Sequence, residues 1–116
     1  YFRHIGINSD VYVFEAPIDM LSYITMNKEN WQESSYVCLG GVAIDALKNI
    51  LSTNEQISKV YMCVDRDDAG DKTVKRIGDE LNEMGYEWER VFPENKDWNE
   101  DLTAESEQTE NFELTM

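Results

Sequence analysis

The stretch at residues 59–70 constrains the fold of this chain more than any other part of the sequence. Five apolar or aromatic residues in a row, at 60–64, predict a strand that is buried on both faces, as in a parallel sheet. The strand runs directly into Asp65, Asp67 and Asp68, and a helical pattern follows at once. Because open α/β sheets bind their ligands beyond the carboxyl ends of the strands, these three acids are predicted to lie at the usual position of a ligand-binding or active site.

Acidic side chains that lie close together repel one another, and a hard cation with oxygen ligands relieves that repulsion. The acids after residue 64 therefore suggest a Mg²⁺ site. Glu15 follows an earlier apolar run, at 11–14, in the same way. Adjacent strands lie about 4.8 Å apart, so Glu15 can share a site with Asp65 and Asp67 only if the first and third predicted strands are neighbours.

Short strands alternate with helical patterns along the chain, which is typical of a parallel sheet with helices on both faces. We predict an α/β fold with a four-stranded, mainly parallel sheet of Rossmann-like type. The last strand, at 86–92, alternates polar with large apolar residues, which favours an edge position. The sequence divides into a lead-in segment (1–10), one domain (11–102) and an acidic tail (103–116). The tail is expected to be a frayed helix or disordered.

The net charge is −14, from 10 Lys and Arg against 24 Asp and Glu. Such a surface repels phosphate backbones, so nucleic acid would be bound with the help of metal ions and neighbouring basic domains. No apolar run approaches the roughly 20 residues that span a membrane. Cys38 and Cys63 fall in apolar strands and are expected to be buried free thiols, which favours the cytoplasm. The start at Tyr1 suggests a fragment of a longer protein.

Four further residues have both a structural and a functional interpretation. Asp19 falls in the first turn of a helix, where the helix dipole stabilises a carboxylate whether or not it has a function. Gly40 and Gly41 follow the second strand and permit either tight packing or backbone contact with a phosphate. Lys72 belongs to the densest basic group of the chain, which is either a solvated helix face or a phosphate contact.

Three motifs, at 15–19, 65–70 and 96–100, each follow a predicted strand. In this order they resemble a TOPRIM domain, the catalytic α/β module shared by bacterial primases, topoisomerases, certain nucleases and recombination proteins. The likeness is greatest to the primase-like variety of plasmid and mobile-element proteins, and it covers residues 11–102. One departure is Ala16, since the residue after the glutamate is commonly glycine in that family.

The resemblance implies roles for seven polar residues. Glu15 would be a general acid/base or a carboxylate near the metal, and Asp65 and Asp67 would bind Mg²⁺ or Mn²⁺. The others would be secondary acids, namely Asp19 and Asp68, or residues of the closing motif that orient the site, namely Asp97 and Asn99.

The function that the resemblance implies is Mg²⁺-dependent phosphoryl or nucleotidyl transfer on nucleic acid, within a larger DNA-processing protein. The partners would be nucleotides, and DNA or RNA held through neighbouring domains. Two alternatives stay open: a nuclease or topoisomerase-type module that cleaves strands, and a degenerate module that binds metal or a partner protein without turnover.

Other families that place acids near a turn fit less well. The pattern at 65–70 matches the start of an EF-hand loop, but Arg76 stands where that loop needs a glutamate, and a strand precedes it instead of a helix. A haloacid-dehalogenase phosphatase would carry its acidic motif after the first strand. A receiver domain, the signalling alternative, would need a fifth strand with a lysine behind the site.

Overall fold

The computed structural model describes residues 3–39 and 44–115. The strands are β1 (Arg3–His4), β2 (Asp10–Phe14), β3 (Ser35–Cys38), β4 (Lys59–Met62) and β5 (Glu87–Arg90). The helices are α1 (Pro17–Met26), α2 (Ile44–Thr53), α3 (Asp68–Met84) and α4 (Trp98–Thr115), with a 3₁₀ turn, η1, at Trp31–Glu33. The α/β class predicted from the sequence is confirmed.

The strands form one sheet in the order β1-β3-β2-β4-β5. Four of them are parallel, and β2 lies next to β4 with Val11 opposite Val60 and Val13 opposite Met62. The predicted neighbourhood of the first and third strands is therefore confirmed, as is the edge position of the last strand.

The predicted number of four strands is wrong, because the lead-in segment contributes a fifth. Strand β1 pairs antiparallel with β3, with Arg3 opposite Val37 and His4 opposite Tyr36. A strand of two residues is too short to show a periodic pattern. Only its pairing with a segment some 30 residues away defines it, and that pairing cannot be read locally.

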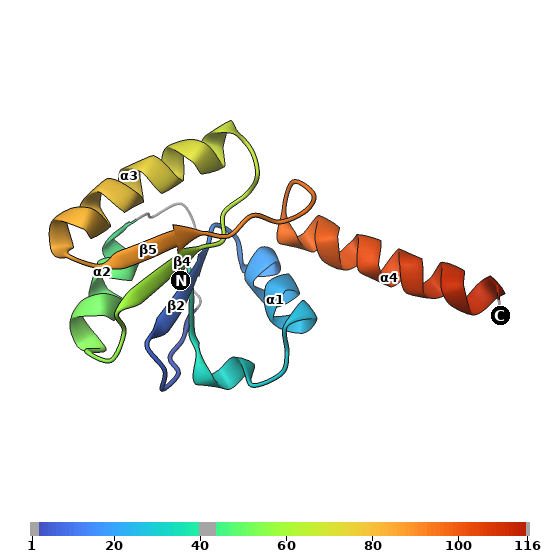
Figure 1. Ribbon diagram of the computed structural model, residues 1–116, viewed down its shortest axis with the longest axis horizontal. Coiled ribbons are helices and arrows are strands. Elements are labelled where there is room, and N and C mark those ends of the chain that lie inside the picture. Colours follow the sequence, from blue (N-terminus) through green and yellow to red (C-terminus); the bar gives the residue numbers. More distant parts are fainter. Residues whose placement is uncertain (1–2, 40–43, 116) are drawn as a thin grey trace.

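Helices cover both faces of the sheet, with α2 and α3 on one face and α1 on the other (Figure 1). The first face buries an aliphatic core that includes Leu47, Ile50 and Ile77. The second core contains Phe14, Trp98 and the two cysteines, both of which are buried as expected. The start of α4 therefore joins the body through Trp98.

The tyrosines of the three central strands stand in one row across the second face. Tyr12 is paired in register with Tyr36 and Tyr61, and its ring centroid lies 5.4 Å and 4.9 Å from theirs. Burial raises the pKa of Tyr12 and of Tyr36. Tyr36 belongs to the second core, and Tyr12 and Tyr61 are partly buried and pack against it.

Apolar residues at helical spacing do not by themselves mark the buried face of α1. Ile18 and Leu21 fall at helical spacing in α1, yet each is 58% exposed, and the helix buries Asp19, Met20 and Ser22 instead. The acidic tail, expected to be a frayed helix or disordered, continues α4 as far as Thr115, and this helix runs away from the body (Figure 1). In the part of the chain that the structure describes, no helix has the length and apolar character required to cross a membrane.

Candidate metal centre

The carboxyl ends of β2, β4 and β5 meet at one edge of the sheet. The parallel ladders extend past the strands, since Cys63 N donates to Val13 O at 2.8 Å and Val91 N donates to Met62 O at 2.9 Å. Glu15 follows β2, Asp65 follows β4, and Asp97 follows the turn after β5. Three acidic segments that are distant in sequence are thereby delivered to the same edge.

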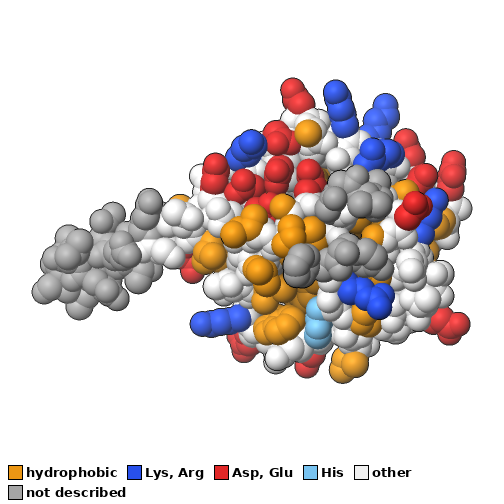
Figure 2. All heavy atoms as spheres, turned by 180° about the vertical axis from the view of Figure 1, so that it is seen from behind, with side chains coloured by type: hydrophobic (Ala, Val, Ile, Leu, Met, Phe, Trp, Pro, Cys, Tyr) orange, Lys and Arg blue, Asp and Glu red, His pale blue; other side chains and the backbone are white. Residues whose placement is uncertain are grey.

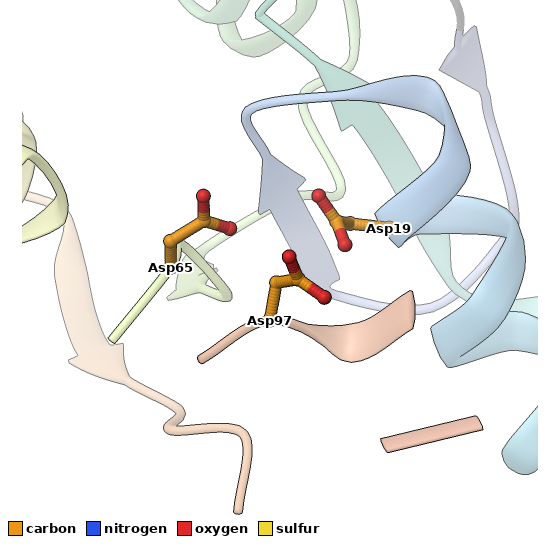
Figure 3. Close-up of side chains that lie close together, drawn as sticks. All are labelled: Asp19, Asp65 and Asp97. Atoms are coloured by element: carbon orange, nitrogen blue, oxygen red, sulfur yellow. The ribbon is translucent and has the colours of Figure 1, made fainter. Parts of the chain in front are cut away.

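Asp19, Asp65 and Asp97 form a three-carboxylate cluster at this edge, and we refer to them as the acidic cluster. One carboxylate oxygen of each lies within 4.8 Å of the others. Figure 3 shows the three side chains pointing toward a common space, from α1, from the turn after β4 and from the start of α4. The sequence indicated Asp65 as a ligand, whereas Asp19 and Asp97 were expected only in secondary roles.

Backbone N–H groups fix two of the three carboxylates. Asp19 is buried, and its Oδ1 accepts a hydrogen bond from the Asn99 N–H at 3.1 Å. The Oδ1 of Asp97 accepts from the Glu100 N–H at 2.8 Å, which caps the first turn of α4. Both carboxylates are thereby held in place by the backbone at the start of α4.

Asp65 is fixed through its main chain. Arg90 on β5 donates from Nη2 to the Asp65 carbonyl oxygen at 3.0 Å, and its Nη1 pairs with Asp71 Oδ1 at 2.6 Å. The indole Nε1 of Trp98 donates to the Cys63 carbonyl oxygen at 3.0 Å, two residues earlier. The turn after β4 is therefore tied to both β5 and α4.

Charge at the cluster is not balanced by the protein itself. Burial raises the pKa of Asp65 to about 6, with further increases from the carboxylates of Glu15, Asp19, Asp67 and Asp97. Burial also raises the pKa of Asp19 and of Glu15. Among the described residues, no Lys or Arg forms an ion pair with a member of the acidic cluster. Such a group of carboxylates favours a bound cation.

The donor set fits a hard divalent cation, because all three side chains offer carboxylate oxygens. Mg²⁺ binds oxygen at about 2.1 Å, so ligands on opposite sides of the ion lie about 4.2 Å apart. The oxygen separations within the cluster are at most 4.8 Å, which is close to that distance. Mg²⁺ and Mn²⁺ both suit these ligands.

Glu15 and Asp67, expected from the sequence to be metal ligands, lie beside the acidic cluster. Glu15 Oε1 accepts a 3.4 Å hydrogen bond from the Asp65 N–H. Asp67 Oδ1 accepts from the Gly70 N–H at 2.7 Å as the N-cap of α3, and its Oδ2 lies 4.0 Å from Lys96 Nζ. Both carboxylates act on the electrostatics of the cluster, since each is a cause of the raised pKa of Asp65.

The other residues predicted from the sequence are not members of the acidic cluster. Asp68 and Lys72 are exposed on α3, outside the acidic cluster. Asn99 contributes its backbone N–H to Asp19, and its side-chain Oδ1 accepts a 3.5 Å bond from Ser22 Oγ. Gly40 and Gly41 lie outside the described residues.

Two features of the site were not expected from the sequence. Gly70 packs so closely on the turn that a Cβ atom there would collide with the Asp65 carbonyl oxygen, which explains the glycine of the motif. Arg90 ties the same turn to β5, and its only sequence signal is an inward-facing position in the alternating edge strand. Ala16, which departs from the family pattern, has φ −128° and ψ 147°, an extended conformation that suits any residue.

Comparisons with known proteins agree with this architecture. A family model described as Toprim-like matches residues 12–102. Among solved structures, the primase fragment of the bacteriophage T7 primase-helicase protein matches with a TM-score of 0.67 and 20% sequence identity. The match covers 96% of the present chain and 45% of that chain, so this chain spans less than half of the fragment. No curated protein sequence matches the chain significantly.

Proposed function

This chain belongs to the Toprim-like family, and from that premise we propose that it is the Mg²⁺- or Mn²⁺-dependent catalytic module of a primase-like, DNA-processing protein. The observation that carries the proposal is the acidic cluster. Carboxylates from three separate segments converge to within 4.8 Å, without an ion pair to any described Lys or Arg. A buried structural role would call for a cationic partner, whereas a metal site needs the charge left open.

The reaction would be phosphoryl or nucleotidyl transfer. A divalent cation held there supplies charge neutralisation of a phosphate and orients the attacking and leaving oxygens. Asp19, Asp65 and Asp97 would hold the ion, and Asp67 would lie next to them, with one oxygen on the Gly70 N–H and the other near Lys96. The backbone bonds to Asp19 and Asp97 limit the movement of those carboxylates, which is the preorganisation that such a site requires.

Glu15 would act as the general acid/base. Its raised pKa, caused chiefly by burial, brings the carboxyl group closer to the pH at which it can both accept and release a proton. Its 3.4 Å hydrogen bond from the Asp65 N–H keeps it beside the acidic cluster. With a net charge of −14, the chain would engage DNA or RNA through bound cations and through basic surfaces elsewhere in its natural protein.

The test compares two variants of the natural full-length protein in assays of primer synthesis and of DNA cleavage, with Mg²⁺ and with EDTA. Asp65→Asn should abolish the activity and also the Mg²⁺-induced rise in melting temperature. Glu15→Gln should abolish the activity and retain that rise, because Glu15 lies outside the acidic cluster.

Activity that survives Asp65→Asn would overturn the proposal. Activity that survives Glu15→Gln would remove the proposed role of Glu15 alone. A metal-induced rise with no turnover in either assay would favour a module that binds metal without catalysis.

A further inference from the structure

Arg66 stands between the two acids of the motif after β4, and its side chain is fixed at the rim of the site. Its Nε donates to the Pro93 carbonyl oxygen at 2.9 Å, and its Cζ lies 4.8 Å from the centroid of the Phe92 ring. The backbone N–H of Arg66 also donates to the Lys96 carbonyl oxygen at 2.7 Å. An exposed arginine whose side chain is held at two points, on a fixed backbone, has lost much of the rotamer freedom that a surface side chain normally keeps.

The charge of Arg66 is available, in contrast to that of its neighbour Arg90. Both guanidinium groups lie over the Phe92 ring, but Arg90 uses its two Nη atoms on Asp71 and on the Asp65 carbonyl oxygen. Within the described part of the chain, Arg66 forms no ion pair, and neither of its Nη atoms makes a hydrogen bond.

Phe92 is 48% exposed, so the ring serves as a platform more than as a core residue. A guanidinium stacked on an aromatic face and fixed through Nε presents its two Nη groups together, in the planar fork that matches the oxygens of a phosphate. Figure 2 shows Lys and Arg side chains bordering a group of acidic ones on one face of the molecule.

We infer that Arg66, held on Phe92, is an anion-binding residue of the site and contacts a phosphate group of the bound nucleotide or nucleic-acid strand. The inference rests on the proposed function, because the acidic cluster would hold the cation that brings a phosphate to this edge. Arg66 adds a positive charge one residue from Asp65, at an edge of the sheet where carboxylates gather. A phosphate could come from a free nucleoside triphosphate or from the backbone of a strand, and both present the same oxygens.

The test measures binding of ATP and of a fluorescent oligothymidine to the chain in Mg²⁺, with Arg66→Gln compared with Arg76→Gln. Both changes remove one positive charge, and Arg76 is exposed on α3, away from the Phe92 platform. Loss of a charge-assisted bidentate contact should weaken binding about tenfold or more in Arg66→Gln. Arg76→Gln should change affinity by less than about twofold, which is the effect of net charge alone. Arg66→Lys should recover only part of the loss, since an ammonium group keeps the charge and loses the fork.

The two ligands distinguish the source of the phosphate. A loss confined to ATP assigns the contact to the nucleotide, and a loss confined to the oligothymidine assigns it to the strand backbone. Equal affinities of Arg66→Gln and the unaltered chain for both ligands would overturn the inference and leave the proposed function standing.

A purely structural role of Arg66 would give a different result. If Arg66→Gln loses the Mg²⁺-induced rise in melting temperature together with its affinity, then Arg66 only holds the turn, and the inference is wrong. If the unaltered chain binds neither ligand in Mg²⁺, the proposed function fails, and this inference fails with it.

Discussion

Removing the charge of Asp65 should stabilise the metal-free protein, although it removes a proposed ligand. Asparagine has nearly the same shape as aspartate and is neutral at every pH. The folded state raises the pKa of Asp65 from 3.8 to about 6, so ionising this carboxyl group opposes folding. The Asp65→Asn substitution removes that opposition.

The size of the effect follows from the pKa. A rise from 3.8 to about 6 corresponds to about 3 kcal/mol, at about 1.4 kcal/mol per tenfold change in proton affinity. Asp65 is only partly buried, and solvent screening reduces the expected gain to about 1–2 kcal/mol. For a domain of this size, that gain raises the melting temperature by roughly 4–10 °C.

The difference in stability between Asp65→Asn and the unaltered chain depends on pH. A carboxyl group whose pKa is raised by folding binds its proton more tightly in the folded state, so the stability that this proton contributes is complete below about pH 4. That contribution is lost as the pH rises toward 6. Asp65→Asn should therefore match the unaltered chain near pH 4 and exceed it in stability above about pH 6, in EDTA.

With bound Mg²⁺, the unaltered chain should be more stable than Asp65→Asn. Saturation at about 100 times the dissociation constant stabilises a protein by about 2.7 kcal/mol, and Asp65→Asn should lose most of this gain. The assay is urea or thermal unfolding with EDTA and with Mg²⁺, on both sides of pH 6. Asp68→Asn is the matched control, because Asp68 is exposed in the first turn of α3 and its charge favours the helix dipole. If Asp65→Asn is less stable than the unaltered chain in EDTA at high pH, or gains as much from Mg²⁺, the reasoning is refuted.

Three further substitutions test other parts of the site. Asp97→Asn should keep the cap of α4, and its free energy of unfolding in EDTA should lie within about 0.5 kcal/mol of that of the unaltered chain. Its melting temperature should rise less with Mg²⁺, and an undiminished rise would remove Asp97 from the metal site. Asp67→Ala should cost about 1 kcal/mol in urea unfolding through loss of the N-cap of α3, whereas Asp67→Asn should cost little; equal costs would show that capping is not what matters. Gly70→Ala should cost about 1–3 kcal/mol in urea unfolding, because the added methyl group collides with the Asp65 carbonyl oxygen; an unchanged midpoint would mean that the turn yields without strain.

Much of this architecture can be predicted from local patterns. The buried strand at 60–64 and the acids at its carboxyl end can be recognised from a few neighbouring residues. A glycine after a helical run is a local stop signal, and Gly85 ends α3 with φ 82°, a conformation that favours glycine. Strand β1, in contrast, has two residues and exists only through its pairing with β3.

By itself, the sequence determined that acids stand at the ends of parallel strands, because a strand, a turn and a helix each follow from neighbouring residues. The tertiary structure alone decided which acids converge. Asp19 receives its hydrogen bond from Asn99, 80 residues away, and Asp97 reaches Asp65 because β5 lies beside β4 and α4 packs on α1. Contacts between residues so far apart in the sequence depend on strand order and helix packing, which no local sequence pattern encodes.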